Sequence, residues 1–519
     1  MIKIMKKITF FSFKVIILNY FFLFVFLNAQ THLPADPFYL LHYEKMQFDK
    51  RLPMLTNIFR PLFFDSDTTS ISLNLRSEMY FNNNAPNQEN MDVRYFSKGI
   101  SNFNSIQIAL NSRHLFFLAE PYMNNNFNNY KIKRVNRSNA TYDVLNDNPL
   151  SSSSRSLSTF RNLLAFVHYK GIGIGFHSGN RWWGPGVHSS LQMSNNTVPI
   201  PANIIGTLKE IRYKSLGFFG LYTFARMNDA EDPFAEYFTS LNGQITWYGP
   251  IIITAGFSRN YLTGGVAMPG YQWSINDAKK IIFEGIFISN LLSEEYTVGG
   301  HDYWDQTLST YFSVTLPNRD LKIYAEMGVN DNRMYFADLL SQPDHSMATI
   351  FGIRDYGIGE SKNWIWGFEW TNLMITYSSR HRPFGGGNWY QRDIYDYSSY
   401  KGRRWGAHSG ADSDDWYFYV GYLSDKYAII PAINYERHGI VSFRPAEVKL
   451  EFRLDTKFNY KDTWFGIYIE NQFEAFLGFP GYYYVDVNNN PTGYVDRSKL
   501  ANTRKTNTII FSISKNINL

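Results

Sequence analysis

The stretch Val448-Lys449-Leu450-Glu451-Phe452-Arg453-Leu454-Asp455 decides the fold class of this 519-residue chain. Its apolar and ionic side chains alternate, so the two kinds fall on opposite faces of a β-strand. A turn follows at 459–462, and a second alternating run, 465–474, continues the same pattern. The two runs predict a β-hairpin with one apolar face and one ionic face.

Similar alternating runs recur along the chain. They flank turns at 170–171, 248–250 and 317–320, and another run occupies 509–519. A soluble sandwich or propeller would bury the apolar face, whereas a transmembrane barrel would turn it towards lipid. Three observations favour the barrel. Strands of about 9–11 residues can cross a bilayer, the connections alternate between very short and very long, and the last run alternates as a closing barrel strand would.

The composition agrees with a membrane barrel. Aromatic residues make up 18% of the chain, which suits a surface that places many rings at the membrane–water boundary. Cysteine is absent, so no disulfide stabilises the fold. The 50 basic and 45 acidic residues give a net charge of +5. Four of the lysines lie in the first thirty residues, so the remainder is near +5 − 4, about +1, and we expect no nucleic-acid partner.

The chain divides into three parts. Residues 1–30 combine positive charge, an apolar run and a small residue near their end, which is the pattern of a secretory signal peptide. Residues 31–66 do not alternate, and their apolar side chains predict a short helix before Pro53, in a periplasmic or plugging segment. Residues 67–519 form the predicted outer-membrane barrel.

The lengths of the connections predict the topology. In outer-membrane barrels the short turns lie on the periplasmic side and the long loops lie outside. We count about 20 strand-like stretches, an even number that returns both ends of the barrel to the periplasm. The long segments, which we expect outside, are 82–104, 122–160, 178–210, 330–362, 380–413 and 476–503.

One long segment contains Arg181-Trp182-Trp183-Gly184-Pro185-Gly186. Gly-Pro-Gly cannot continue a helix or a central strand, so Gly184, Pro185 and Gly186 predict a sharp turn beside two tryptophans. Two interpretations of this turn stay open. The rings can stack on sugars while neighbouring polar groups bind hydroxyls or carboxylates, or both rings can pack inside the barrel mouth.

A family resemblance rests on this turn and on a second patch. Residues 180–196, which read Asn-Arg-Trp-Trp-Gly-Pro-Gly and then His-Ser-Ser-Leu and Ser-Asn-Asn, resemble the signature of the capsule assembly Wzi family, in its Bacteroidetes-type branch. The second patch, 389–415 with 435–437, agrees. The resemblance implies an outer-membrane barrel of 18 strands with a helical N-terminal part, which binds capsular polysaccharide at the cell surface. We therefore expect 18 strands rather than 20.

The second patch is rich in charge. Arg392, Arg403 and Arg404 can contact an acidic polysaccharide, or can pair with carboxylates across the barrel lumen. The stretch 412–415 offers hard oxygen ligands for calcium, but the glycine and the distal glutamate of an EF-hand are missing. We therefore predict no metal site and no cofactor.

The sequence holds no catalytic motif of the Gly-x-Ser-x-Gly, His-Glu-x-x-His or phosphate-loop kind. We predict a non-enzymatic surface lectin that holds capsular polysaccharide or exopolysaccharide to the outer membrane. The expected partners are this polysaccharide, outer-membrane lipid and the barrel assembly machinery. The alternatives are an outer-membrane channel or transporter and an outer-membrane hydrolase. The predicted binding residues are Arg181, Trp182, Trp183, His188, Arg392, Arg403 and Arg404.

Overall fold

The structure of the chain is a computed structural model. It describes residues 32–56, 58–63, 69–84, 89–94, 98–126, 156–227, 234–265, 268–283, 304–330, 340–377, 389–390, 398–400, 403–440, 446–476 and 503–518. The predicted signal peptide at 1–30 lies outside the described residues.

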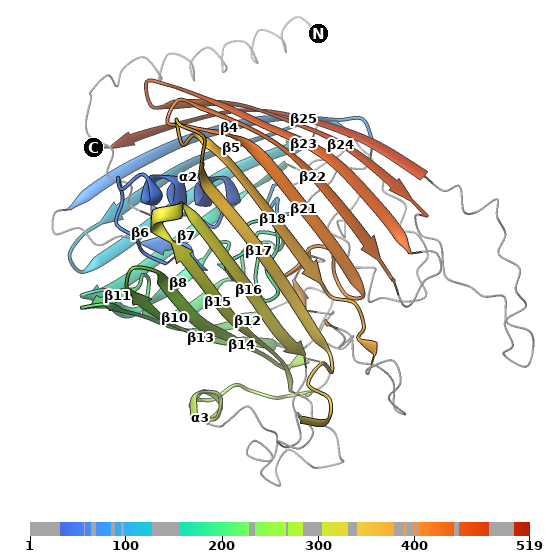
Figure 1. The fold of residues 1–519 in the computed structure, drawn as a ribbon. Coiled ribbons are helices and arrows are strands. Elements are labelled where there is room, and N and C mark those ends of the chain that lie inside the picture. The colour runs from blue at the N-terminus through green and yellow to red at the C-terminus, as the bar shows by residue number, and fades with distance from the viewer. Residues whose placement is uncertain are drawn as a thin grey trace, which may run out of the picture.

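A closed antiparallel barrel makes up most of the described chain (Figure 1). Its last strand, β25, closes the barrel by pairing with β4, as in the register of Phe511 with Met79. The short strands β10 and β11 both pair with β12, so they count as one interrupted strand and the barrel has 18 strands. The number implied by the family resemblance is confirmed, and the count of about 20 from the sequence pattern is wrong.

The barrel strands are β4 (Ser70–Asn82), β5 (Gly99–Asn111), β6 (Leu115–Asn126), β7 (Ser156–Tyr169), β8 (Ile172–Ser178), β10 (Ala202–Thr207), β11 (Ile211–Tyr213), β12 (Leu216–Met227), β13 (Glu236–Tyr248), β14 (Ile252–Gly264), β15 (Asp305–Leu316), β16 (Leu321–Asn330), β17 (Met347–Ile358), β18 (Trp364–Asn372), β21 (Ser413–Leu423), β22 (Tyr427–His438), β23 (Glu447–Tyr460), β24 (Thr463–Ala475) and β25 (Thr503–Asn518).

The alternation seen in the sequence sets the two faces of the wall. In β23, Lys449 and Glu451 are buried on the inner face, whereas Phe452 between them is 54% exposed on the outer face. Strand β24, which pairs with β23, exposes Ile467 and Ile469 in the same way. The predicted hairpin is therefore confirmed, with its ionic face towards the lumen and its apolar face outwards.

The two ends of the barrel carry connections of different length. Turns such as 170–171, 424–426 and 461–462 join strands at one end, whereas the strands that flank 127–155 and 265–304 meet these longer connections at the other end. The first barrel strand begins, and the last one ends, at the end with the short turns. Short and long connections alternate around the barrel, as the sequence predicts.

The N-terminal segment makes two small sheets before the barrel begins. Strand β1 (His32–Leu33) pairs with β3 (Leu62–Phe63). Strand β2 (Phe59–Arg60) pairs with β9 (Trp182–Trp183), which belongs to the loop between β8 and β10. The N-terminal segment is thus joined by backbone hydrogen bonds to the turn that holds the two tryptophans.

Helix α2 (Pro37–Phe48) lies inside the barrel (Figure 1). Asp36 caps its first turn by accepting a hydrogen bond from the Phe38 backbone N–H at 2.9 Å, as helix N-termini require. From the middle of the helix, the Glu44 carboxylate accepts from Lys322 at 2.7 Å and from Arg354 at 3.0 Å, and both of these belong to the barrel wall. The helix expected before Pro53 therefore plugs the lumen.

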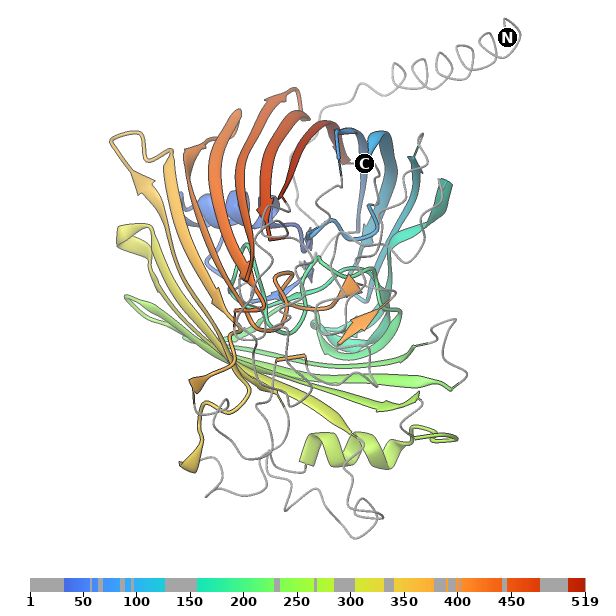
Figure 2. The same ribbon diagram turned by 90° about the vertical axis from the view of Figure 1, so that its right-hand side faces the viewer.

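Helix α3 (Ile275–Phe283) lies outside the wall, beside β14 (Figure 2). Ile281 of this helix packs in one apolar cluster with Tyr261 of β14. Within the described ranges, no helix has both the length and the apolar character needed to cross a membrane. The remaining elements are β19 (Ser399–Tyr400), which pairs with β20 (Arg403–Arg404), and the turn helix η4 (Pro317–Arg319).

Candidate functional site

The turn with the two tryptophans folds into the barrel. Trp182 and Trp183 are 0% and 1% exposed. The guanidinium carbon of Arg60 lies 4.8 Å above the Trp182 ring, and the Trp183 ring stacks on Phe238 of the wall at 6.2 Å between centroids. Of the two interpretations that the sequence left open, the structure has the rings packed inside the barrel.

A carboxylate of the barrel wall holds the chain just after the turn. Glu369 of β18 accepts hydrogen bonds from the backbone N–H groups of Val187 at 2.8 Å, His188 at 3.2 Å and Ser189 at 2.6 Å. The Tyr324 hydroxyl donates to the same carboxylate at 2.7 Å. Four donors around one buried carboxylate satisfy a charge that would otherwise be costly to bury.

Arginine side chains hold the carbonyl groups of the turn. Arg354 donates to the Pro185 carbonyl at 2.9 Å, and Arg60 donates to the Gly186 carbonyl at 3.0 Å. The backbone is so close-packed here that a Cβ atom added at Gly186 would lie 2.1 Å from the Ser189 carbonyl oxygen. Glycine is therefore the residue that fits at this position.

The predicted binding residue Arg181 is turned towards its own loop. It is 3% exposed and donates to the carbonyl groups of Ile200 at 2.9 Å and His177 at 2.7 Å. Burial lowers the pKa of Arg181 to about 9. Both hydrogen bonds join the start of the loop to its neighbours, so the side chain fixes the path of the chain into the lumen.

The predicted arginines of the second patch are buried as well. Arg403 is 6% exposed and donates to the Asp92 carbonyl at 2.8 Å. The Arg404 guanidinium is 1% exposed and lies 5.7 Å from the centre of the Tyr390 ring. Arg392 lies outside the described residues.

The two patches that carry the family resemblance contact each other. The Ser194 N–H donates to the Trp405 carbonyl at 2.6 Å, and the Asn196 amide donates to the Arg404 carbonyl at 3.1 Å. The Tyr390 hydroxyl completes the contact by donating to the Leu191 carbonyl at 2.5 Å. Two loops far apart in sequence therefore form one packed body, which we call the loop plug, residues 179–201 with 389–390, 398–400 and 403–412.

His188 leaves the turn and reaches a polar cluster on the wall. Its Nε2 atom lies 3.1 Å from the Asp415 carboxylate, and the His408 Nε2 atom lies 3.2 Å from the same carboxylate oxygen. The other aspartates of the stretch 412–415 point elsewhere. Asp414 accepts from Arg437 at 2.8 Å, and Asp412 accepts from the Ile375 N–H at 3.5 Å.

The sequence analysis did not identify the wall residues that form hydrogen bonds with the turn, of which Glu369 is the main one. One signal was available. In β18, Glu369 is the only charged residue, and aromatic side chains fill the alternate positions 364, 366, 368 and 370. A single carboxylate on the inner face of an aromatic strand must find buried donors, so its position predicts a partner in the lumen.

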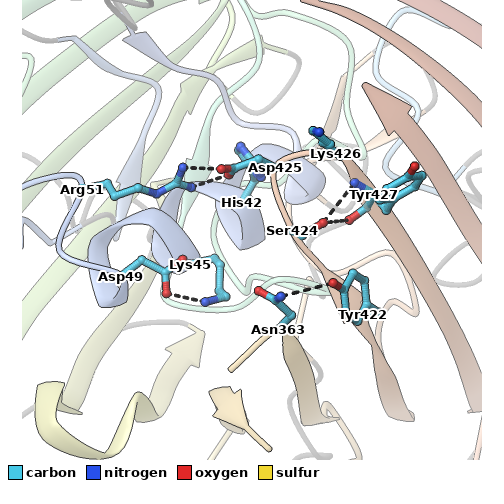
Figure 3. A pocket seen from close by; sticks show the side chains of 10 residues that line it. All are labelled: His42, Lys45, Asp49, Arg51, Asn363, Tyr422, Ser424, Asp425, Lys426 and Tyr427. Atoms are coloured by element: carbon cyan, nitrogen blue, oxygen red, sulfur yellow. Dashed lines mark hydrogen bonds and ion pairs between the residues drawn. The ribbon is translucent and has the colours of Figure 1, made fainter. Parts of the chain in front are cut away.

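A cavity of about 450 Å³ lies at the opposite end, between α2 and the short turns (Figure 3). Arg51 crosses its edge by donating two hydrogen bonds to Asp425, at 2.7 and 2.5 Å. The cavity is far from the long connections, so it does not belong to the predicted polysaccharide site. Its lining residues are His42, Lys45, Asp49, Arg51, Asn363, Tyr422, Ser424, Asp425, Lys426 and Tyr427.

Comparisons with known proteins agree on one family and one fold. The family model of the capsule assembly protein Wzi matches residues 77–472, a range that includes both patches. Among solved structures, Wzi of Escherichia coli, described as an outer membrane protein involved in group 1 capsule assembly and a carbohydrate-binding β-barrel, is similar with a TM-score of 0.58 and 13% identity, over 94% of this chain and 99% of that chain.

More distant barrels also match. OccK5 (OpdH) of Pseudomonas aeruginosa is similar with a TM-score of 0.38 and 9% identity, over 87% of this chain and 98% of that chain. OprD of Pseudomonas aeruginosa has a TM-score of 0.37 and 6% identity, over 88% of this chain and 95% of that chain. No curated protein matches the sequence.

Proposed function

The chain belongs to the capsule assembly protein Wzi family, and we propose that it is a non-enzymatic lectin of the outer membrane that binds and anchors capsular polysaccharide or exopolysaccharide. The observation that carries the proposal is the family match over residues 77–472, supported by a closed 18-stranded barrel whose outer face is apolar. Binding takes place without turnover of the polysaccharide.

The end of the barrel with the long connections is the surface that meets the polysaccharide. Short turns lie on the periplasmic side in outer-membrane barrels, so the long connections extend from the cell. These connections include 127–155, 265–304 and 373–412. Several loops around one barrel mouth can contact a long polymer at many points, and multivalent contact gives firm retention from weak individual sites.

The predicted binding residues that are buried do not lie on this surface, and they act on it through the loop plug. Because Trp182, Trp183 and Arg404 are almost fully buried, we propose that they contribute to polysaccharide binding by holding the loop plug, not by stacking on sugar. Arg392 lies in the same connection as Arg404 but outside the described residues. It stays our candidate for direct contact with an acidic polysaccharide.

The alternatives of a channel and a hydrolase have less support. The described part of the lumen contains α2 and the loop plug, whose side chains pack against the wall in two buried apolar clusters. Buried packing of this kind leaves little room for a conducting path. Conductance of the purified barrel in planar bilayers would favour the channel, and labelling by an active-site probe would favour the hydrolase.

A retention assay in cells tests the proposal. Deletion of the gene should release polysaccharide from the cell surface into the medium, and the wild-type chain should restore retention. Arg392→Ala should weaken retention, whereas the matched control Arg319→Ala should not, because Arg319 is exposed in a short turn at the other end. Normal retention without the gene would contradict the proposal.

Labelling of intact cells tests the orientation on which this assay depends. Epitope tags in 122–160 or 380–413 should be labelled from outside, and tags at 318–319 should not. The reverse result would turn the barrel around and would place the loop plug at the periplasmic end.

A further inference from the structure

Four side chains from three parts of the fold converge beside the loop plug. His188 comes from the loop between β8 and β10, which holds the two tryptophans, and His408 comes from the connection before β21. Asp415 belongs to strand β21 of the wall, and Glu436 belongs to strand β22. All four are buried, and their ligand atoms lie within 4.8 Å of one another. Side chains of this kind are common metal ligands.

Hydrogen bonds do not account for this arrangement. The His188 Nε2 atom and both carboxylate oxygens of Asp415 make no hydrogen bond within the described structure, although His188 is only 4% and Asp415 only 1% exposed. The Nε2 and Oδ2 atoms of these two residues are 3.1 Å apart, as an ion pair if the imidazole is protonated. Buried polar atoms without hydrogen bonds require another partner.

The distances fit ligands around one small cation. In a tetrahedral site with bonds of about 2.0–2.1 Å, neighbouring ligand atoms are about 3.3 Å apart. The observed separations are 3.1 Å for His188 to Asp415, 3.2 Å for His408 to Asp415 and 3.4 Å for His408 to Glu436. Two imidazole nitrogens with two carboxylate oxygens form a ligand set that suits Zn²⁺.

The packing of the histidine rings also orients their nitrogens. The His188 ring stacks on Tyr417 at 4.1 Å between centroids and 9° between planes, and meets the His408 ring edge-on at 4.6 Å. Rings held between neighbours cannot turn away from the cluster without losing these contacts. A fixed ring orientation is what supporting residues provide around metal-bound histidines.

The charge around the cluster favours a divalent cation. Among the described residues, these four side chains and the groups with which they form ion pairs include three carboxylates, Asp415, Glu436 and Glu89, and one side chain with permanent positive charge, Lys449. The ammonium of Lys449 already lies among the carboxylates of Glu89, Glu436 and Glu451. Lys449 is thus shared among three carboxylates, and within the cluster it contacts only Glu436, so a cation bound between His188, His408, Asp415 and Glu436 would also neutralise Asp415.

We propose that His188, His408, Asp415 and Glu436 bind one Zn²⁺ ion, which links both loops of the loop plug to strands β21 and β22. The site is structural, since all four protein ligands are available and the cluster is buried. Its consequence is mechanical. The ion joins the loop plug, which supports the long connections, to the barrel wall at the point where the turn with the two tryptophans ends.

Metal content of the assembled barrel tests the site. The full chain is folded into detergent from metal-free denaturant with Zn²⁺ added, dialysed, and analysed for zinc by mass spectrometry. We expect one zinc per chain, lost in His188→Gln and in Asp415→Asn. His177→Gln is the matched control, because His177 is equally buried in β8 but lies outside the cluster. Heat-modifiable migration on a gel shows which variants have assembled.

X-ray absorption at the zinc edge keeps the test decisive if the variants fail to assemble. The wild-type spectrum should show four nitrogen or oxygen neighbours at about 2.0 Å, with imidazole scattering. No retained zinc in the assembled wild-type barrel would overturn the proposal. So would zinc retained by an assembled His188→Gln or Asp415→Asn variant, or a spectrum without imidazole. Zinc bound by the wild-type barrel together with normal polysaccharide retention in cells without the gene would instead count against the proposed lectin function alone.

Discussion

The hairpin β23–β24 and the Trp-Trp turn are both rich in large side chains, but they use them in opposite ways. In the hairpin, Phe452 is 54% exposed on the outer face of the wall. In the turn, Trp183 is 1% exposed and is enclosed by residues of the wall. The solvent differs for the two regions: lipid surrounds the outer face of the hairpin, and protein surrounds the turn.

This difference shows that a plugged barrel has two apolar environments, and that each places different requirements on its side chains. On the outer face, a residue needs only to be apolar, because lipid adapts to its shape. In the lumen, shape and hydrogen bonding both matter, because packing is dense and every buried polar group needs a partner. Glu369 and Arg354, which hold the turn, have no counterpart on the outer face of β23.

The largest expected effect comes from removing a ring from the lumen. Trp183→Ala should destabilise the barrel by about 3–5 kcal/mol, since truncation of a buried Trp leaves a cavity that close-packed neighbours cannot fill. Trp247→Ala removes the same ring from the outer wall, where Trp247 is 41% exposed, and should cost less. Urea-dependent loss of the fast-migrating gel band measures both. Equal losses would contradict the distinction between the two regions.

The next largest effect comes from placing a charge on the outer face. Phe452→Arg should cost about 2–4 kcal/mol, because Phe452 lies near the middle of β23 and so near the middle of the bilayer. Phe452→Leu keeps the face apolar and should change little. The same urea titration in lipid vesicles measures both variants. If arginine is tolerated as well as leucine, this face does not contact lipid.

The sequence was sufficient to predict the wall. A period of two is a local property, so residues 448–474 by themselves indicate a strand pair with a lipid-facing side and an ionic side. The alternation of short and long connections was readable for the same reason. The strand number was not, because it depends on pairing. The sequence pattern places 202–207 in the long connection 178–210, whereas in the structure this segment joins the wall and, through its shared pairing with β12, forms one interrupted strand with 211–213.

The interior of the site could not be predicted in this way. The sequence marks the Trp-Trp turn as unusual, but the residues that bury it, such as Arg60 and Glu369, are more than 100 positions away. Likewise, nothing near His188 points to Asp415. A lumen contact depends on which loop folds inwards, and that choice follows from the combined packing of the whole plug.

A smaller effect is expected from a single methyl group at the turn. Gly186→Ala should destabilise the loop plug by about 1–3 kcal/mol, because the added Cβ would lie 2.1 Å from the Ser189 carbonyl oxygen and the backbone must move. Gly220→Ala on the wall is the matched control, since its Cβ would have no neighbour within 4 Å. Limited proteolysis of the assembled barrel reports release of the plug. Equal cleavage of the two variants would show that the turn tolerates movement.

The smallest effect concerns pH and the N-terminal helix. Burial would raise the pKa of the Asp36 carboxyl, but Arg76 and Arg94 outweigh it and lower the pKa to about 2. Arg76 lies 3.9 Å away, on β4. A carboxyl whose pKa is lowered by folding stabilises the folded state at pH values above its ordinary pKa near 4. This contribution disappears as the pH falls towards 2.

Asp36→Asn keeps the helix cap and removes only the charge, so it should cost about 1 kcal/mol at neutral pH and nothing near pH 2. The temperature of the gel-band shift, measured from pH 7 to pH 2, should therefore converge for the two proteins. A constant difference across this range would mean that the charge of Asp36 does not help to hold α2 in the lumen.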